Sequence, residues 1–513
     1  MKPVWASSRA RRWCCASRAA RFFPAWRARL AAFGRQARTV RSQPLPQLEK
    51  VLGRLLPPGL LVPAAARTNS RQRLYSLPCA FWAFLWQALN PDCPCREVVR
   101  LLQALFCLRQ RAQASAGTGA YCQARGRLPL SLLQQIRAGA ASQADKLLPT
   151  AWERWRGFAL KVVDGTTVSL PDTPANQRAY PQLSSQKPGC GFPLLKLVGL
   201  FSLSTGALLG YVIGNKHQHE LPLFRRLWDW LKPGDLLLAD RGFATYPVLA
   251  LLEKRGVACL FRLHQARPAD LRQGIRLGRH DRLFVWSKPP QKPRYLPQNL
   301  WRTVPQELVV RVLRVHAFRP GFRTQSVTLV TTLTDAAAFP APELAGLYLR
   351  RWSIELWWRD IKTSMGMETL RCLSPAMAHK ELEMYLIGYN LIRCLAVEAG
   401  ALHDRPIERF SFKGAVDAVR QFAPLVAQAR AGKRRRALLA KLLAKLLAKL
   451  LAKLLAKLLA KLLATLAADL VPHRPGRREP RVVKRRPKPY QLLNRPRHDM
   501  KELPHRSKYR KSP

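Results

Sequence analysis

The stretch GDLLLADRGFATYPVLALLEKRGVACLFRL, residues 234–263, decides the fold that the sequence predicts. Its first part, GDLLLAD, is a run of consecutive apolar residues that ends at Asp240, which is typical of a strand buried on both faces. The helical pattern YPVLALLEKRG follows, with Gly256 at the position of a C-terminal cap, and VACLFRL is a second apolar strand. Strand, helix and strand with continuous apolar runs predict a partly parallel α/β sheet.

The segments on either side add strands and helices to this unit. Upstream lie the strand patterns FALKVV and TVSL, and then a predicted hairpin of LKLVGLFSL and ALLGYVI. Helical periodicity dominates residues 75–150 and returns after residue 339, whereas Pro-rich loops and strands occupy residues 264–335. The predicted organisation is a basic extension (1–70), a helical domain (71–150), an α/β core in two parts (151–263 and 339–431) around a β-rich insertion (264–338), a repeat helix (432–470) and a basic tail (471–513).

The charge of the chain is strongly unbalanced. The 513 residues carry a formal net charge of +58, from 88 Lys and Arg against 30 Asp and Glu. The first 48 residues carry +11 and residues 432–513 carry +21, which leaves +26 for the middle of the chain. This excess favours a polyanionic partner over an anionic membrane surface or a merely basic composition, and it argues against a metabolic enzyme with an acidic surface.

Cysteine usage and hydropathy indicate a cytoplasmic protein. Among the 11 cysteines only Cys14 with Cys15 and Cys93 with Cys95 are close in sequence, so we expect reduced thiols rather than a zinc site. The Arg-rich start resembles a transit peptide, but we favour a DNA-contacting arm or an unstructured extension, because the C-terminus is just as basic. The uncharged stretches 74–91 and 197–215 are predicted as a buried helix and a β-hairpin, not as membrane spans.

Residues 437–465 repeat a four-residue unit of Lys, two Leu and Ala. Each unit advances about 40° around an ideal helix, so the lysine stripe drifts and leaves no single apolar face. We interpret the repeat as a slippage-type expansion that forms a long solvated or partly packed helix, rather than as a helical arm or a membrane-active amphipath.

Two aspartates follow apolar strand patterns. Asp164 ends FALKVV and precedes Gly165, and Asp240 ends LLLA and precedes Arg241. The sequence therefore predicts both carboxylates at the carboxyl ends of sheet strands, where open α/β sheets place their sites. A turn-forming or helix-capping Asp is the alternative for either residue alone.

The helical pattern around residue 350 contains four polar residues at offsets 0, 3, 7 and 14 from Tyr348: Tyr348 itself, Arg351, Glu355 and Lys362. On an ideal helix they share a stripe about 60° wide and about 21 Å long. An aromatic, two cations and a carboxylate would be an unusual core face, so the stripe is a candidate functional surface. A solvated face with an ion pair between Arg351 and Glu355 is the alternative.

The Y-x2-R-x3-E-x6-K spacing, with DGTTVSLPDTPANQRAYPQ and LLLADRGF upstream, resembles DDE transposases of the IS-four insertion-sequence family. The resemblance extends from about residue 75 to 395, with an echo in RPGRREPRVVKRRPKP near the C-terminus. It implies an RNase H-like core in which Asp164, Asp240 and Glu355 form a metal-binding triad. The expected fold class is therefore α/β: an RNase H-like mixed sheet flanked by helices, with an all-β insertion before the last catalytic helix and a helical N-terminal domain.

The resemblance also implies a chemistry. Carboxylates are hard oxygen ligands that suit two Mg²⁺ ions, with Mn²⁺ as a substitute. Two such ions would activate the attacking hydroxyl and stabilise the leaving oxygen of an in-line displacement on a phosphodiester, with water first and the freed 3′-hydroxyl later as nucleophile. Tyr348, Arg351 and Lys362 would contact phosphates beside the cut, and Arg241 is added to this DNA-binding set.

The resulting hypothesis is a bacterial cut-and-paste transposase in the cytoplasm, associated with the nucleoid and not with a membrane. Its partners would be double-stranded DNA at terminal inverted repeats and target DNA, with a homodimer pairing two ends. A decayed copy that binds DNA without catalysis and a general nuclease of the same fold are the alternatives. The sequence has no GKS or GKT phosphate loop and no dinucleotide fingerprint, so ATP and NAD dependence are unsupported.

Several other residues are weaker candidates. We interpret His217 and His219 as parts of a polar loop with Glu220 rather than as metal ligands. Trp286 and Trp301 in the insertion are predicted to pack, with stacking on an extruded base as the alternative. Three tryptophans off the stripe are predicted to be core residues: Trp352, Trp357 and Trp358.

Overall fold

The computed structural model describes residues 44–61, 74–108, 114–264, 270–317 and 325–420, together with Arg267 and a few residues between 460 and 467. The predictions for the extension before residue 44, for most of the Lys-Leu-Leu-Ala repeat and for the C-terminal tail lie outside these residues. Leu462 and Leu463, near the end of the repeat, are buried in the main hydrophobic core.

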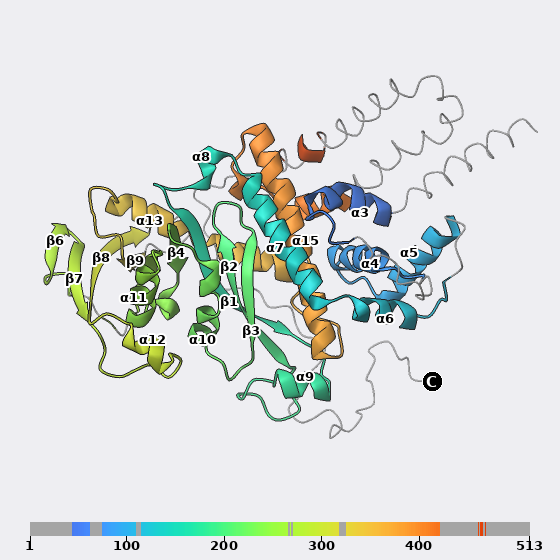
Figure 1. The fold of residues 1–513 in the computed structure, drawn as a ribbon, viewed down its shortest axis with the longest axis horizontal. Helices are drawn as coiled ribbons and strands as arrows, with labels where there is room; N and C mark the ends of the chain where they lie inside the picture. The colour runs from blue at the N-terminus through green and yellow to red at the C-terminus, as the bar shows by residue number, and fades with distance from the viewer. Residues whose placement is uncertain are drawn as a thin grey trace, which may run out of the picture.

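A mixed sheet forms the centre of the described part of the chain, with nine strands in the order β3-β2-β1-β4-β5-β9-β8-β7-β6 (Figure 1). β1, β4 and β5 run parallel to one another, and the other neighbouring strands pair antiparallel. The first five strands in this order are the RNase H-like sheet that the sequence predicts. The strands are β1 (Ala159–Ser169), β2 (Leu194–Ser202), β3 (Leu208–Gly214), β4 (Asp235–Ala239), β5 (Ala258–Arg262), β6 (Ile275–Gly278), β7 (Asp281–Ser287), β8 (Glu307–Ala317) and β9 (Gln325–Thr331).

The strand, helix, strand unit at residues 234–263 is confirmed as β4, α11 (Tyr246–Lys254) and β5. The apolar run of β4 is continuous because the sheet has a core on each face: Leu236 and Leu238 belong to one hydrophobic cluster, and Leu237 belongs to the other. Gly256 has φ of +72° directly after the helix, which is the left-handed conformation expected of a C-terminal cap.

The prediction that a strand ends at Asp164 is wrong. FALKVV and TVSL form one strand, β1, and Asp164 lies within it, paired with Gly199 of β2. The antiparallel pairing with β2 continues to Ser169, whereas the parallel pairing with β4 stops at Val162. An Asp-Gly pair is typical of turns, but here the long ladder with β2 keeps the backbone extended.

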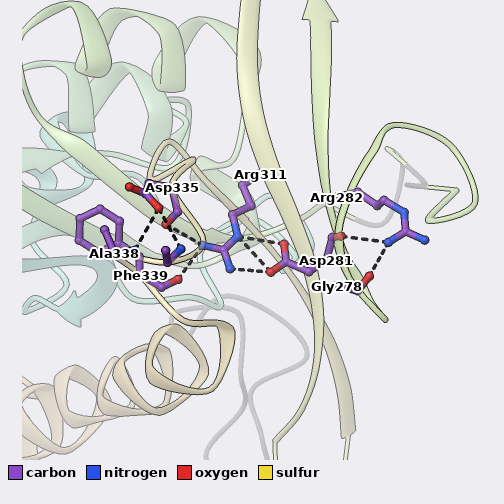
Figure 2. A network of polar contacts seen from close by, with 8 residues as sticks. Gly278, Asp281, Arg282, Arg311, Asp335, Ala338 and Phe339 are labelled. Atoms are coloured by element: carbon purple, nitrogen blue, oxygen red, sulfur yellow. Dashed lines mark hydrogen bonds and ion pairs between the residues drawn. The ribbon is translucent and has the colours of Figure 1, made fainter.

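The β-rich insertion continues the central sheet, because β9 pairs with β5. Besides its strands it contains one short helix among the described residues, α12 (Gln298–Arg302). The fully buried Arg311 of β8 anchors the insertion: its Nε donates to Asp281 Oδ1 over 2.9 Å, and its Nη1 donates to the Phe339 carbonyl over 2.6 Å (Figure 2). Phe339 precedes α13 (Ala341–Arg350), so the Arg311 side chain joins the insertion to the start of that helix.

The helical region before the sheet packs on the long helix α15 (Pro375–His403), and the segment Leu77–Leu89 is the buried helix predicted from its lack of charge. In Figure 1, α7 and α15 cross the centre, α4 to α6 lie to the right and the insertion strands lie to the left. The remaining helices are α3 (Pro44–Leu52), α4 (Leu77–Leu89), α5 (Cys95–Leu108), α6 (Gly119–Arg127), α7 (Leu130–Lys146), α8 (Thr150–Glu153), α9 (Pro174–Ala179), α10 (Glu220–Arg225) and α14 (Ser353–Arg359).

Buried polar contacts fix α7, β3 and α15 to one another. Arg137 Nε donates to Glu383 Oε2 over 3.1 Å, and the Tyr211 hydroxyl donates to Glu383 Oε1 over 2.8 Å. A buried ion pair with its remaining oxygen satisfied avoids the large penalty of an unpaired buried charge. In the described part of the chain, no helix is both long and apolar enough to cross a bilayer.

Candidate active site

Asp164 and Asp240 occupy equivalent positions on two neighbouring parallel strands. In the parallel pairing of β1 with β4, each residue of β1 lies opposite the residue 76 positions later in the chain, and the last such pair is Val162 with Leu238. Asp164 and Asp240, each two residues farther along, are separated by the same 76 positions. Asp240 follows directly after β4, so both aspartates lie at the carboxyl edge of the parallel pair.

Other charges surround the half-buried Asp164. Burial, together with the negative charges of Glu220 and Glu355, raises the pKa of its carboxyl to about 6. Two groups oppose that rise: the Gly165 amide, which donates to Asp164 Oδ1 over 2.8 Å, and the Arg351 guanidinium. Glu220 and Glu355 therefore each lie close enough to Asp164 for their charges to act on its carboxyl.

The prediction of a single ideal helix around residue 350 is wrong. A tight turn at Arg351 separates α13 from α14, and a π-helical turn, Asp360–Ser364, follows α14. In the tight turn the Arg351 amide donates to the Tyr348 carbonyl, three residues back, whereas the Met365 amide donates to the Asp360 carbonyl, five residues back. These changes of hydrogen-bond spacing alter the rotation per residue, so the stripe calculated at 100° per residue does not describe this segment.

Arg351 lies among the carboxylates. Its side chain is buried, and its Nη2 is 3.4 Å from Glu355 Oε1, while the Glu355 side chain is 48% exposed. Burial lowers the pKa of Arg351, but Tyr348, Asp240, Asp164 and Glu355 raise it overall. The ion pair considered from the sequence is therefore present, as one contact of a larger cluster.

Tyr348 contributes a buried hydroxyl to the same cluster. Burial raises its pKa to about 12, against the positive charge of Arg351, while the negative charge of Asp240 adds to the rise. The Tyr348 hydroxyl and Arg351 Nε are buried and have no hydrogen-bond partner among the described residues. Unpaired buried donors are costly, and an anionic ligand such as a phosphate could accept from both.

The other two cations predicted to bind DNA lie next to this cluster in the chain. Arg241 is exposed and begins the short turn after Asp240. Lys362 is partly exposed and lies in the π-helical turn. Its carbonyl accepts from the Glu368 amide, and the Glu368 carbonyl accepts from the amide of Ser169, which places this turn beside the end of β1.

Glu220 is a fourth carboxylate that sequence reasoning assigned only to a polar loop. It begins α10, and a Cβ added to Gly165 would lie 2.4 Å from Glu220 Oε1, so its side chain reaches across β1 beside Asp164. His217 and His219 are exposed. No local pattern could have revealed the position of Glu220, because it depends on the packing of α10 against β2, β3 and the turn after Asp240.

The donor set fits Mg²⁺ chemically. Among the described residues no group of three or more His, Cys, Asp or Glu side chains is placed to hold a metal ion by itself. Proteins usually hold Mg²⁺ through one or two carboxylates with waters and substrate phosphates completing the octahedron, so an open arrangement of Asp164, Asp240 and Glu355 suits this ion. Burial, and to a smaller extent the charges of Glu220 and Glu355, raise the pKa of Asp164, and a bound cation would favour its ionised form.

The tryptophans divide into core and surface residues. Trp357 and Trp358 are buried, as predicted, but the prediction for Trp352 is wrong, because its side chain is 39% exposed and lies 5.6 Å from the Arg351 guanidinium carbon. It flanks the tight turn, where the chain departs from the ideal helix. Trp301 is buried and packs against Lys288, and the partly exposed Trp286 lies under the Arg267 guanidinium.

Three comparisons relate the chain to known transposases. Residues 155–391 match the family model described as a transposase DDE domain. The chain is 27% identical over 347 residues to the transposase InsG for insertion sequence element IS4 of Escherichia coli (strain K12), covering 67% of this chain and 75% of that protein. A cryo-EM structure of the piggyBac transposase synaptic complex with hairpin DNA aligns with a TM-score of 0.40 and 9% identity, over 80% of this chain and 84% of that one.

The matched region contains the aspartate pair, the tight turn with Arg351 and the sheet that supports them. Together with the two sequence matches, it defines a DNA transposase of the DDE class. Residues 155–391 are similar to transposase DDE domains, and the similarity to the IS4-element transposase covers 67% of this chain.

Proposed function

We propose that this transposase cleaves and rejoins DNA at a metal-dependent site formed by Asp164, Asp240 and Glu355. The register that aligns the two aspartates, with Glu355 near enough to raise the pKa of Asp164, carries the proposal. Mg²⁺, with Mn²⁺ as a substitute, would supply charge stabilisation at the attacking and leaving oxygens of the phosphodiester. The three carboxylates would hold the ions, and Arg351 would balance part of the carboxylate charge.

The remaining residues of the cluster would position the DNA backbone. Arg351 Nε and the Tyr348 hydroxyl are buried donors without protein partners, which supports a role as phosphate ligands beside the cut. Arg241 and Lys362 are at least partly exposed, so their cationic heads can reach phosphates farther along the strand. None of these four side chains needs to read a base, so end recognition would rest on other parts of the chain.

The substrate would be double-stranded DNA at the terminal inverted repeats, followed by target DNA in a cut-and-paste reaction. The +26 charge of the middle of the chain supports binding along an extended polyanion. We assign end recognition to the helices α4 to α7 and synapsis of two ends to a homodimer.

The test is cleavage of two end-labelled duplexes in Mg²⁺, one carrying the ends of the element and one of unrelated sequence and equal length. The proposal expects cuts at the element ends, followed by joining to a target plasmid, and no cuts in the unrelated duplex. Equal cutting of both duplexes would identify a general nuclease. Binding of the ends with no cutting in Mg²⁺ or Mn²⁺ would identify a decayed copy.

A further inference from the structure

Four cysteines line one cavity away from the carboxylate cluster. The cavity has a volume of about 400 Å³ and lies between the helices α4 to α6 and the start of α15. Cys93 comes from the turn before α5, Cys95 begins α5, Cys122 comes from α6 and Cys372 comes from the loop before α15. Only the first two are neighbours in sequence, so the sequence alone could not reveal the group.

Hydrogen bonds join two of these sulfurs through a short relay. The Gln87 amide nitrogen donates to Cys95 Sγ over 3.7 Å, and Arg125 Nη1 donates to Gln87 Oε1 over 3.4 Å. Arg125 Nη2 in turn donates to Cys122 Sγ over 3.6 Å. The relay holds Cys95 and Cys122 on the same wall of the cavity, each with a donor directed at its sulfur.

The two thiols also act on each other directly. Burial raises the pKa of the Cys95 thiol and Arg125 lowers it, while the adjacent Cys122 thiol raises it through charge and a hydrogen bond. Arg125 is buried, so its hydrogen bond to Cys122 Sγ is shielded from solvent.

Exposure distinguishes this pair from the other two thiols. Cys95 and Cys122 are partly exposed, whereas Cys93 and Cys372 are buried. Burial raises the pKa of Cys93 to about 12 and raises that of Cys372 still further, so both remain protonated and unreactive. Among the cavity cysteines, only Cys95 and Cys122 combine partial exposure with a side-chain hydrogen-bond donor at the sulfur, and the relay through Gln87 and Arg125 joins them.

We propose that Cys95 and Cys122 form a reversible dithiol–disulfide site that is oxidised by small disulfides such as oxidised glutathione. The Cys122 thiolate attacks one sulfur of the oxidant, which forms a mixed disulfide and releases one glutathione thiolate that takes up a proton. Cys95 then loses its proton and attacks the Cys122 sulfur, which expels the second glutathione. Two protein thiols are oxidised, and one disulfide is reduced to two thiols.

The bond would link the start of α5 to α6 across the cavity wall. Arg371, on the opposite wall, donates from Nη1 to the Cys93 carbonyl over 3.3 Å and precedes Cys372. The cross-link would therefore lie where the helical region meets the segment that leads from Lys362 into α15. It is independent of the metal site proposed above, because none of the four cavity cysteines belongs to the carboxylate cluster.

The test uses the full-length protein, equilibrated in mixtures of reduced and oxidised glutathione, alkylated and digested with trypsin. We expect a cross-linked product of the peptides 74–96 and 112–125, with fragment ions that assign the bond to Cys95 and Cys122, and its loss on addition of dithiothreitol. Cys107, on the exposed face of α5, is the internal control and should react only as a single thiol. Cys122→Ser should abolish the cross-linked product, whereas Cys107→Ser should leave it unchanged.

Three outcomes would overturn the proposal. The first is that Cys95 and Cys122 stay fully alkylatable at a glutathione potential that modifies Cys107. The second is a disulfide between any other two cysteines of the cavity. The third is a metal ion bound to the thiols of the purified protein, detected by native mass spectrometry, that must be removed before the cysteines react. The wild-type peptide map decides among these outcomes even if a variant fails to fold.

Discussion

Asp164 and Asp240 each lie two residues beyond Val162 and Leu238, the last pair of the parallel register of β1 and β4, in which the offset is 76 residues throughout. The alignment does not require both strands to end there, since β1 continues to Ser169. Asp164 is thus held by a ladder on its β2 side, whereas Asp240 lies at a strand end from which the chain turns away. The two carboxylates are placed by the least deformable part of the fold, as a preorganised site requires.

Asp164→Asn should stabilise the metal-free protein at pH 8 and not at pH 4. The pKa of Asp164 is raised from 3.8 to about 6 in the fold, so between these values the native state binds more protons than the unfolded state. The free energy of unfolding therefore falls as pH rises through this window and levels off above it. Urea unfolding should show Asp164→Asn gaining about 2 kcal/mol over the wild type between pH 4 and pH 8.

The matched control for this measurement is Asp229→Asn, because the Asp229 side chain is 88% exposed. It should show no comparable dependence on pH. A stability difference between Asp164→Asn and the wild type that stays constant from pH 4 to pH 8 would contradict the raised pKa.

Gly165→Ala should lower the pH midpoint of metal binding while changing stability little. The new Cβ would lie 2.4 Å from Glu220 Oε1, the far end of a flexible side chain, which can swing away. Because Glu220 raises the pKa of Asp164, its displacement lets Asp164 ionise at lower pH. Mn²⁺ titration by calorimetry across pH 5 to 8 measures the midpoint, and a midpoint that moves upward would count against this role of Glu220.

Lys362→Ala should weaken DNA binding mainly by removing one phosphate contact. The slope of log K against log salt should then become shallower by about 0.9, with similar losses on specific and unrelated duplexes. Lys254→Ala is the control, because Lys254 is exposed at the end of α11, at the opposite edge of the sheet from Asp240. Fluorescence anisotropy at several salt concentrations gives both slopes, and equal slopes for the two variants would remove Lys362 from the interface.

Arg311→Met should destabilise the protein by about 3–5 kcal/mol, because it leaves the buried Asp281 carboxylate without its partner. The double variant Arg311→Met, Asp281→Leu should recover most of that loss, since no buried charge remains. Denaturant unfolding of the two single variants and the double variant measures the coupling. If the double variant loses as much unfolding free energy as the two single variants together, the stabilisation by Arg311 comes mainly from its hydrogen bonds to the carbonyls before α13 (Figure 2).

The sequence predicts best where a pattern is local. The unit from β4 to β5 follows from apolar runs, a proline in the first turn of α11 and a glycine at its end, all within 30 residues. The Asp-Gly pair at Asp164 misleads, because the ladder that keeps it extended comes from β2, farther along the chain.

The same limit applies to the site. Spacing alone identifies Tyr348, Arg351 and Glu355 as a group, and the structure brings these residues together even though the helix that was expected to align them is broken. Glu220 and the cavity cysteines depend on contacts between distant segments, which have no periodicity to reveal them. Trp352 is exposed because the tight turn beside it rotates its side chain away from the direction that it would have in an ideal helix.

The most direct test of the central claim is the rate at which the protein cuts a labelled element end in Mg²⁺, compared among Asp240→Asn, Glu355→Gln and the control Asp229→Asn. Loss of a metal ligand should slow cleavage by at least about a hundredfold in the first two variants, with DNA binding retained, because even groups that merely orient ligands matter to that extent. The control should cut at the wild-type rate. Cleavage by Asp240→Asn or Glu355→Gln within twofold of the wild-type rate would contradict a carboxylate metal site.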